Sequence, residues 1–339
     1  MKGLKIGSKF IFILNSLVAF LLLISYLLPY IPPKNFATLS VLSLSVPLLI
    51  LLNVIFFVYW LLRVKKQLVL SLIVLVLGWS YISSMYKFSS SKHVEDDNNI
   101  SVLSYNVRLF NRFDWLPSKT IKEDIVEFIY KEDPDIICFQ EYPRGIQLLL
   151  KGYENYNARY TKEAKGGQVI YSKFPIVNSG SLEFPNSNNN GIYVDIVKQK
   201  DTIRVYTLHL QSSGIKTEVE DLKNETSGHL FRQVGTTFKK QQEQVELFLK
   251  HKKQTKHKTI VTGDFNNTAY SYIYKEIKGE DLIDTFEEAG NGFGKTFDFK
   301  FFPLRIDFIL SDKDFIVNGF KTYDVKFSDH YPIKATLKL

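Results

Sequence analysis

The chain has 339 residues, of which 43 are Lys or Arg and 35 are Asp or Glu, giving a formal net charge of +8. Residues 1–90 hold eight of the basic residues and no acidic one, so residues 91–339 hold 35 of each and are neutral overall. The bulk charge therefore does not support the broad basic surface of a nucleic-acid-binding domain, and the single cysteine, Cys138, excludes an intrachain disulfide or a cysteine metal cluster.

Three uncharged stretches predict three transmembrane helices within a membrane region of residues 1–88. They cover about residues 10–33, 38–62 and 67–86, and each has roughly the 20 apolar residues needed to cross a hydrocarbon core about 30 Å thick. A cleaved signal peptide is the alternative for the first stretch. That alternative is disfavoured because the stretch exceeds the usual apolar length of about 7–15 residues and two more spans follow.

The basic residues around these spans predict their orientation. They are Lys2, Lys5 and Lys9 before the first span, Lys34 in the first link, and Arg63, Lys65 and Lys66 in the second link. By the positive-inside rule the N-terminus and the second link are cytoplasmic, so three crossings place the rest of the chain outside. For a bacterial-type inner membrane, that compartment is the periplasm.

A polar segment, residues 89–99, then predicts a tether, and residues 100–339 predict one catalytic domain of α+β class. Helices are expected at Lys119–Lys131, with Ser118 as N-cap, and at Lys239–Lys250. The expected strands are Ile100–Val107, Asp135–Gln140 with a buried Cys138, Gly167–Ser172, Gly191–Val197, Ile203–Leu210, Thr259–Gly263, Arg305–Leu310 and Tyr331–Leu339. A hairpin about Lys198–Asp201 joins two of them.

Acids, amides and histidines gather where the predicted strands end. They are Asn106, Glu141, His209, Asp264, Asn266, Asp307, Asp329 and His330. Each alone has a structural explanation as a turn, cap or hydrogen-bonded core residue. Together, the hard oxygen ligands suit Mg²⁺ or Mn²⁺ and leave two histidines for proton transfer. Zinc is less favoured, because the chain has neither a cysteine ligand set nor an HExxH-type pair of histidines.

Six motifs in order carry a resemblance to a known superfamily. They are Leu103–Val107, Ile137–Glu141, Leu208–Gln211, Thr262–Asn266, Arg305–Ile309 and Ser328–His330. In this order they resemble the endonuclease/exonuclease/phosphatase superfamily over residues 100–339. The resemblance implies a four-layer sandwich, two β-sheets flanked by helices, with the site between the sheets at one end. In Gly167–Ser172 the chain departs from the family, which usually has a small residue where Gln168 stands.

The resemblance also implies roles for the site residues. Asn106 and Glu141 would hold the main metal ion, Mg²⁺ or Mn²⁺, with Asp329 as a further ligand. Asp264 and Asn266 would position the phosphate and the nucleophile. Asp307 would orient His330, which would act as the base, and His209 would contact the scissile phosphate.

The function expected is a membrane-anchored, metal-dependent phosphoesterase, with a lipid headgroup as the favoured substrate. Two alternatives stay open. An anchored extracytoplasmic nuclease is supported by the basic segment Lys250–Lys258, whose other interpretation is a solvated loop. A noncatalytic binding domain on the same fold is disfavoured by the complete set of site residues. Residues 214–238, expected to form a loop or helix beside the site, are where substrate choice is anticipated.

Overall fold

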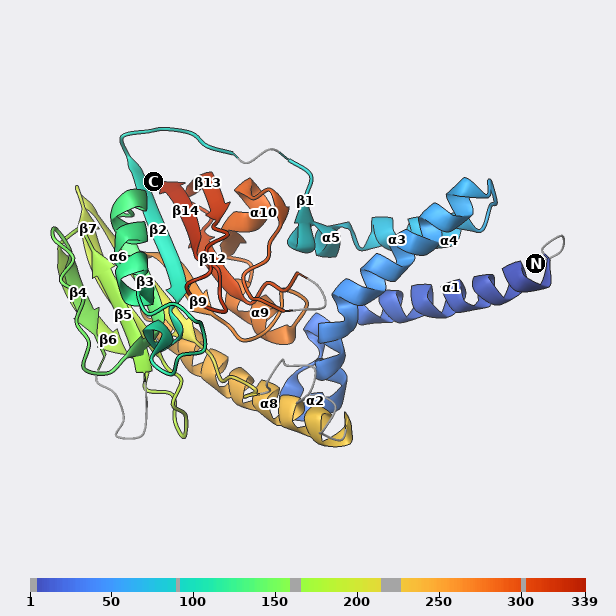
Figure 1. Ribbon diagram of the computed structural model, residues 1–339, viewed down its shortest axis with the longest axis horizontal. Coiled ribbons are helices and arrows are strands. Elements are labelled where there is room, and N and C mark those ends of the chain that lie inside the picture. The colour runs from blue at the N-terminus through green and yellow to red at the C-terminus, as the bar shows by residue number, and fades with distance from the viewer. Residues whose placement is uncertain (1–4, 90–91, 159–165, 215–226, 300–302) are drawn as a thin grey trace.

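The computed structural model describes residues 5–89, 92–158, 166–214, 227–299 and 303–339. Its C-terminal part contains two six-stranded sheets that face each other (Figure 1). The first contains β2 (Asn99–Asn106), β3 (Ile136–Pro143), β4 (Glu154–Asn157), β5 (Gly166–Ser172), β13 (Ile316–Thr322) and β14 (Ile333–Lys338). Their order is β13-β14-β2-β3-β5-β4, and only β2 and β3 are parallel neighbours.

The second sheet contains β6 (Ile176–Ser181), β7 (Gly191–Lys198), β8 (Asp201–His209), β9 (Lys258–Asp264), β10 (Leu282–Asp284) and β12 (Asp307–Asp312). Their order is β10-β12-β9-β8-β7-β6, with β8 and β9 parallel. The predicted hairpin is confirmed, because β7 and β8 pair antiparallel up to Lys198 opposite Asp201. Every predicted strand has a counterpart, while β4, β6, β10 and β13 were not predicted.

Helices complete four layers, which confirms the fold class expected from the sequence. The helix α6 (Ile121–Glu132) packs on the outer face of the first sheet, where Ile125 and Ile129 meet Tyr105 and Phe139. On the second sheet's outer face lie α8 (Ser227–Lys252) and α9 (Tyr272–Lys278). The short α10 (Thr285–Ala289) follows β10.

Two details of the predicted helices are wrong. Ser118 is not the N-cap of α6; Thr120 holds that position without a capping side-chain bond, and the Ser118 hydroxyl lies 3.1 Å from the Thr120 hydroxyl instead. The helix predicted at Lys239–Lys250 begins much earlier, at Ser227, because its first half packs on a distant part of the chain. Of residues 214–238, residues 215–226 lie outside the described residues and the last twelve belong to α8.

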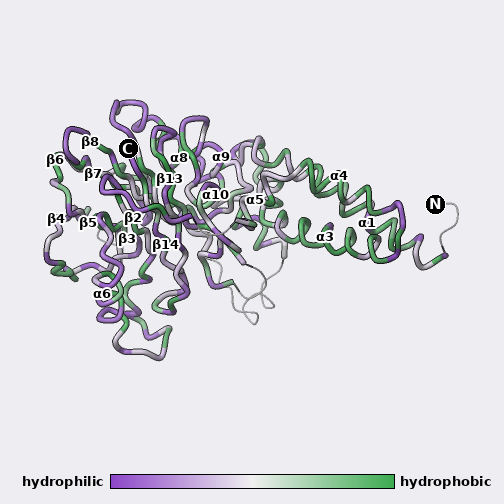
Figure 2. Tube along the Cα trace, turned by 90° about the horizontal axis from the view of Figure 1, so that it is seen from above, coloured by the Kyte–Doolittle hydropathy of each residue, from purple (hydrophilic) through white to green (hydrophobic). Residues whose placement is uncertain are grey.

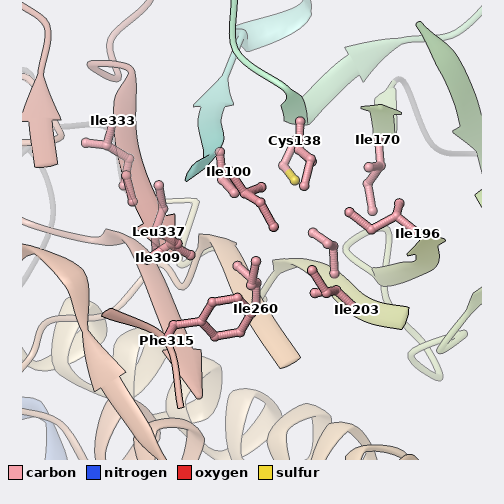
Figure 3. Packing of buried hydrophobic residues seen from close by; sticks show 14 of the residues in the cluster. Ile100, Cys138, Ile170, Ile196, Ile203, Ile260, Ile309, Phe315, Ile333 and Leu337 are labelled. Carbon is pink, nitrogen blue, oxygen red and sulfur yellow. The ribbon is translucent and has the colours of Figure 1, made fainter. Parts of the chain in front are cut away.

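The core between the sheets is formed by β-branched and aliphatic residues from both inner faces (Figure 3). Ile100, Cys138 and Ile170 from the first sheet face Ile203 and Ile260 from the second, and all five are fully buried. The predicted burial of Cys138 is confirmed, and that burial raises the pKa of its thiol to about 12.

The N-terminal region consists of helices rich in apolar residues, the longest of which project away from the sandwich while others pack against it (Figures 1 and 2). They are α1 (Ile6–Ser25), η1 (Leu28–Tyr30), α2 (Pro33–Val41), η2 (Leu42–Ser45), α3 (Val46–Leu62), α4 (Leu68–Leu77) and α5 (Trp79–Met85). Residues 6–30 and 33–62 are long and apolar enough to cross a membrane, as predicted. The strand β1 (Tyr86–Lys87) follows α5.

The third predicted span is not one straight helix. It consists of α4 and α5, which are bent by 75° relative to each other. Gly78 separates them, and a Cβ there would lie 1.9 Å from the hydroxyl oxygen of Tyr26, the residue after α1, so a larger residue would displace the end of that side chain. This stretch counts as a third span only if the bent pair crosses as a unit.

Candidate active site

The candidate site residues meet because the strands that carry them end at one edge of the sandwich. His209 ends β8 opposite Asp264 at the end of the parallel β9, and the antiparallel β12 begins at Asp307, opposite the same Asp264. On the other sheet Asn106 ends β2, and its Nδ2 lies 3.4 Å from Oε1 of Glu141 on β3. Chemistry-bearing side chains from both sheets therefore share one site.

The backbone at these strand ends has conformations that fix where the side chains point. Gly263 has φ +127°, and a Cβ there would lie 1.9 Å from the carbonyl oxygen of Leu208, so only glycine allows β8 and β9 to pair this closely. Glu141 and Asn266 adopt left-handed conformations, each with φ 48°. Non-glycine residues are held in this region at a cost of about 1–3 kcal/mol, and such strain is frequent at functional sites.

His330 and Asp307 form a buried hydrogen-bonded pair. His330 Nδ1 lies 2.9 Å from Oδ2 and 3.1 Å from Oδ1 of Asp307, and Nε2 lies 3.7 Å from Oδ2 of Asp264. Burial alone would lower the pKa of His330, but the charges of Asp307 and Asp264 outweigh it and raise that pKa to about 10. The pair has the geometry of a base and the residue that orients it.

Asp264 is the centre of the constellation. Its Oδ2 accepts a hydrogen bond from Asn106 Nδ2 at 3.1 Å, and its Oδ1 accepts one from the backbone N–H of Asn266 at 2.8 Å. The Asn266 side chain also donates to the carbonyl of Leu210 at 3.0 Å. Burial raises the pKa of Asp264, although the positive charge of His330 opposes the shift. Asp264 thus links the two sheets across the site.

Glu141 and His209 lie beside Asp264 without direct hydrogen bonds between them. His209 Nε2 is 3.9 Å from Glu141 Oε1 and 3.8 Å from Asp264 Oδ2, and it has no hydrogen-bond partner among the described residues. Burial, and then the charge of His330, lowers the pKa of His209 to about 3, so its imidazole is neutral. Glu141 remains 35% exposed, yet desolvation by the surrounding protein raises its pKa.

Gln168, where the chain departs from the family pattern, supports the strand end that carries His209. Its side chain is buried and donates to the carbonyl oxygen of Asn190, which also accepts the backbone N–H of His209 at 2.8 Å. The larger side chain therefore fills a structural position next to the site.

Asp329 lies at the rim of the site and pairs with a cation of the chain itself. Arg108 Nε is 3.1 Å from Asp329 Oδ2, and the Arg108 guanidinium stacks 4.4 Å from the centre of the Trp115 ring. Neither Arg108 nor Trp115 was predicted from the sequence as a site residue. The only signal was their position in the segment directly after Asn106.

The donor set at this site fits a divalent cation. Carboxylate oxygens of Glu141 and Asp264 both accept from Asn106 Nδ2, and oxygen donors of this kind are the ligands that Mg²⁺ and Mn²⁺ prefer. A second grouping, Asp264, Asp307 and His330, has ligand atoms within 4.8 Å of one another. In that grouping the direct hydrogen bond between Asp307 and His330 already occupies one donor from each residue.

An open cavity of about 500 Å³ leads to the site. It is lined by Glu141 and His209 on the polar side and by Leu109, Phe113 and Trp115 on the apolar side. A neighbouring cavity of about 450 Å³ shares Gly166, Asn188 and Asn189 with it and is lined mostly by neutral polar residues. The site can therefore admit a substrate with both a polar part and an apolar part.

Two family models match the chain. The model described as Endonuclease/Exonuclease/phosphatase family matches residues 103–330, and one described as a domain of unknown function matches residues 8–85. A phospholipase C of Staphylococcus aureus is 25% identical over 337 aligned residues, which cover 81% of this chain and 97% of that protein.

Solved structures share the fold. The catalytic domain of human Nocturnin superposes with a TM-score of 0.54 at 17% identity, covering 71% of this chain and 93% of that one. A mannosyl-6-phosphatase of Bacteroides thetaiotaomicron gives a TM-score of 0.54 at 21% identity, covering 71% and 100%. TDP2 of D. rerio, solved with a single-strand DNA product, gives 0.54 at 16%, covering 72% and 100%. At these identities the likeness shows the fold alone.

Proposed function

This chain belongs to the endonuclease/exonuclease/phosphatase family, and from that premise we propose that it is a membrane-anchored, divalent-cation-dependent phosphoesterase whose substrate is a lipid headgroup. The observation that carries the proposal is the group of acids, amides and two histidines that meet at the strand ends. The surroundings of one histidine raise its pKa, and those of the other lower it. The similarity to a phospholipase C supports the lipid substrate, as does the presence of helices apolar enough to cross a membrane.

In the proposed mechanism, Glu141 and Asn106 would hold Mg²⁺ or Mn²⁺, with Asp329 as a further ligand. The ion would supply positive charge against the developing charge on phosphoryl oxygen. His330, whose Nδ1 is held by Asp307, accepts a proton from water at Nε2 when its imidazole is neutral.

Asp264 and Asn266 position the phosphate and the attacking water in this mechanism. The neutral His209 directs its unpartnered Nε2 towards the scissile group, where an N–H donor at that atom stabilises the oxyanion. A His209 that stays neutral at all physiological pH values is suited to donate a hydrogen bond without altering the charge of the site.

The packing of the N-terminal region supports the predicted topology. Lys34, in the link between the first two spans, donates its backbone N–H to Gln242 of α8 at 2.9 Å and pairs with Glu246 at 2.5 Å. The start of α1 and the turn between α3 and α4, which carries the other basic link, lie at the far end of the helices (Figure 1). We therefore propose a cytoplasmic N-terminus and an extracytoplasmic catalytic domain, periplasmic in a bacterial-type inner membrane.

The nuclease alternative has less support from the structure. The basic segment Lys250–Lys258 connects the end of α8 to the start of β9, whereas Asp264 lies at the other end of that strand. Seven strand residues span about 20 Å, so this segment does not line the site. A salt-dependent mobility shift with duplex DNA would favour the nuclease nevertheless.

The test is turnover by the purified full chain in detergent micelles with phospholipids, sphingolipids, inositol phosphates and DNA. Each substrate is assayed with Mg²⁺, with Mn²⁺ and with chelator. We expect cation-dependent release of a phosphorylated headgroup, abolished by Glu141→Gln and unaffected by Asp201→Asn. Asp201 is exposed and lies at the opposite end of β8 from His209, which makes it a matched carboxylate control. Chelator-resistant turnover would contradict the proposal.

A further inference from the structure

The last residues of the N-terminal region form a small sheet with the catalytic domain. The strand β1 pairs antiparallel with β11 (Gly292–Phe293), placing Tyr86 opposite Phe293. The two aromatic rings meet edge to face at 4.8 Å, and the backbone N–H of Gly294 donates to the carbonyl of Met85 at 3.2 Å. Residues 292–294 are thus held by the N-terminal region rather than by either main sheet.

The residues that follow β11 hold the catalytic pair. The Thr296 hydroxyl is fully buried and accepts the backbone N–H groups of Ile306 and Asp307, each at 3.0 Å. The Thr296 carbonyl accepts the N–H of Tyr331 at 2.7 Å. The Phe297 ring packs edge to face on the His330 imidazole at 4.9 Å. One segment therefore fixes both partners of the His330–Asp307 pair.

A second connection runs through buried polar groups. The Ser84 hydroxyl on α5 donates to Oε1 of Glu287 on α10. Glu287 also lies 3.9 Å from NH2 of Arg305, and NH1 of Arg305 donates to Asp284 at 2.6 Å. Arg305 is 8% exposed and precedes Asp307 by two residues. This chain of contacts reaches β12 independently of β11.

The loop after the Asp264 strand docks on the same helices. Tyr270 belongs to the apolar cluster formed by α1, α3 and α4. Its ring stacks on Tyr81 at 6.0 Å, and its hydroxyl donates to the Tyr81 carbonyl at 3.3 Å. The loop that follows β9 and the segment that precedes β12 therefore both contact the N-terminal region.

We propose that the end of the N-terminal region, Ser84 to Tyr86, is a positioning element for the His330–Asp307 pair, so that the apolar region tunes catalysis as well as anchoring the domain. Ser84 and Tyr86 contact neither the cavity nor the catalytic side chains. They act through Glu287 and Phe293 on the segments that fix His330 and Asp307. This inference rests on the proposed function.

Adjacent serines provide a matched test in the full-length chain. Ser84→Ala removes the bond to Glu287 together with a bond to the Ser80 carbonyl of its own helix. Ser83→Ala removes only the corresponding bond to the Trp79 carbonyl, and Ser83 is half-buried. With a water-soluble phosphodiester, we expect Ser84→Ala to lower kcat about three- to tenfold with KM unchanged, since small misplacements of catalytic groups lower the rate without affecting binding. Ser84→Thr, which keeps a hydroxyl, restores kcat.

A second pair of variants tests the β1–β11 contact with little risk to folding. Phe293 is 50% exposed, and Phe293→Ala removes its contact with Tyr86. Phe88→Ala is the control, because Phe88 is 74% exposed and contacts only aromatic residues of the N-terminal region among the ring pairs described. We expect a kcat defect in Phe293→Ala alone, and equal kcat in all four alanine variants would overturn the inference.

Ring resonances of the histidines provide a readout that does not depend on turnover. The chain has six histidines, so ¹⁵N-histidine labelling of the full chain in micelles resolves His330 by comparison with His330→Gln. Ser84→Ala and Phe293→Ala should shift the His330 ring signals, while Ser83→Ala and Phe88→Ala leave them unchanged. If the wild type is inactive but these two variants still shift the His330 signals, the proposed function is refuted and the positioning role stands. Unshifted signals would refute the positioning role alone.

Discussion

Each half of the site contains a largely buried histidine, but the two histidines differ in their electrostatic surroundings. In the His330 half, formed with Asp307, the imidazole is 7% exposed and bonds a carboxylate at 2.9 Å. In the His209 half, formed with Glu141, the imidazole is 12% exposed and its nearest carboxylate oxygens are 3.8–3.9 Å away. The pKa of His330 rises to about 10, whereas that of His209 falls to about 3.

Direct contact explains the difference. Burial lowers the pKa of both histidines, and at His330 the charges of Asp307, in hydrogen-bonding contact, and of Asp264 reverse that effect. In the His330 half the protein supplies the partner of Nδ1, because Asp307 bonds it, and leaves Nε2 free to meet water. The His209 half is incomplete, with an unpartnered Nε2 and a Glu141 carboxylate whose pKa is raised. We expect the second half to be completed by cation and substrate.

The largest expected loss of kcat comes from substitutions in the His330 half. His330→Ala should lower kcat by roughly 10²–10⁴-fold, the range typical of general base catalysis. Asp307→Asn should cost much of the same factor, and the double variant should be little worse than His330→Ala, because the two residues act as a unit. Steady-state kinetics on variants checked by circular dichroism give the test. Fully additive losses would show that the residues act independently.

Asp307→Asn also tests, through the pH dependence of kcat, whether Asp307 raises the pKa of His330. The pKa of His330 is raised chiefly by Asp307 and Asp264, and a base is active only when deprotonated. Removing the Asp307 charge should therefore lower the His330 pKa and move the rising limb of the kcat–pH profile to lower pH. A profile that stays in place in Asp307→Asn would mean that another group controls the limb.

The second largest effect concerns the incomplete half. Glu141→Gln removes one carboxylate from the proposed cation site, and losing the several kcal/mol that a metal ion contributes corresponds to about 10²–10³-fold in rate. Because Glu141 lacks a strong partner in the protein, its loss should leave the thermal midpoint unchanged or higher. Calorimetry with and without Mg²⁺ checks this: Mg²⁺ should raise the midpoint of the wild type and not of Glu141→Gln.

His209 should contribute less to kcat than His330 does. His209→Ala removes one hydrogen-bond donor to the phosphoryl group, worth roughly 10²-fold in kcat or somewhat less when other donors remain. Since the pKa of His209 lies near 3, His209→Gln, which keeps a neutral donor, should recover part of the rate without altering the pH profile. A pH limb that disappears in His209→Gln would contradict the neutral imidazole.

The sequence predicted the site residues far better than it predicted the residues that hold them in place. Asn106, Asp264 and His209 end apolar strands, and this local pattern singled them out, while the resemblance of the ordered motifs to a known family predicted that they meet between the sheets. Thr296 and Phe297 lie in an irregular segment whose importance depends on β1 pairing with β11 across about 200 residues of chain, and no local pattern reveals such a pairing.

The same distinction holds for the fold. Strands with continuous apolar runs were predicted, whereas β4, with two Asn residues among four positions and a largely exposed surface, resembles a loop in sequence. The bend in the third apolar stretch lies at Gly78, which faces the Tyr26 side chain at the end of α1. Hydropathy detects the length of that stretch and not its direction.

The smallest expected effect is on stability and comes from a carboxylate far from the site that already has hydrogen-bond partners in the protein. Glu132 is hydrogen-bonded by Tyr323 and by Lys334 at 2.8 Å, with Lys321 at 3.4 Å. Burial alone would raise the pKa of Glu132, but these partners outweigh it and lower that pKa to about 2. An unfolded Glu titrates near 4.3, so the stabilisation is fully present above about pH 4.3 and is lost as the pH falls towards 2.

Glu132→Gln should therefore lower the melting temperature at pH 7 by about 2–4 °C, the shift that about 1 kcal/mol produces in a domain of this size. The difference from the wild type should shrink as the pH is lowered from 5 to 3, because protonation removes the same charge from the wild type. Its kcat should not change, in contrast to Asp307→Asn, which removes a carboxylate bonded to the catalytic base. Calorimetry and kinetics on both variants measure this contrast, and a kcat loss in Glu132→Gln would show that carboxylate pairing far from the site also tunes the active site.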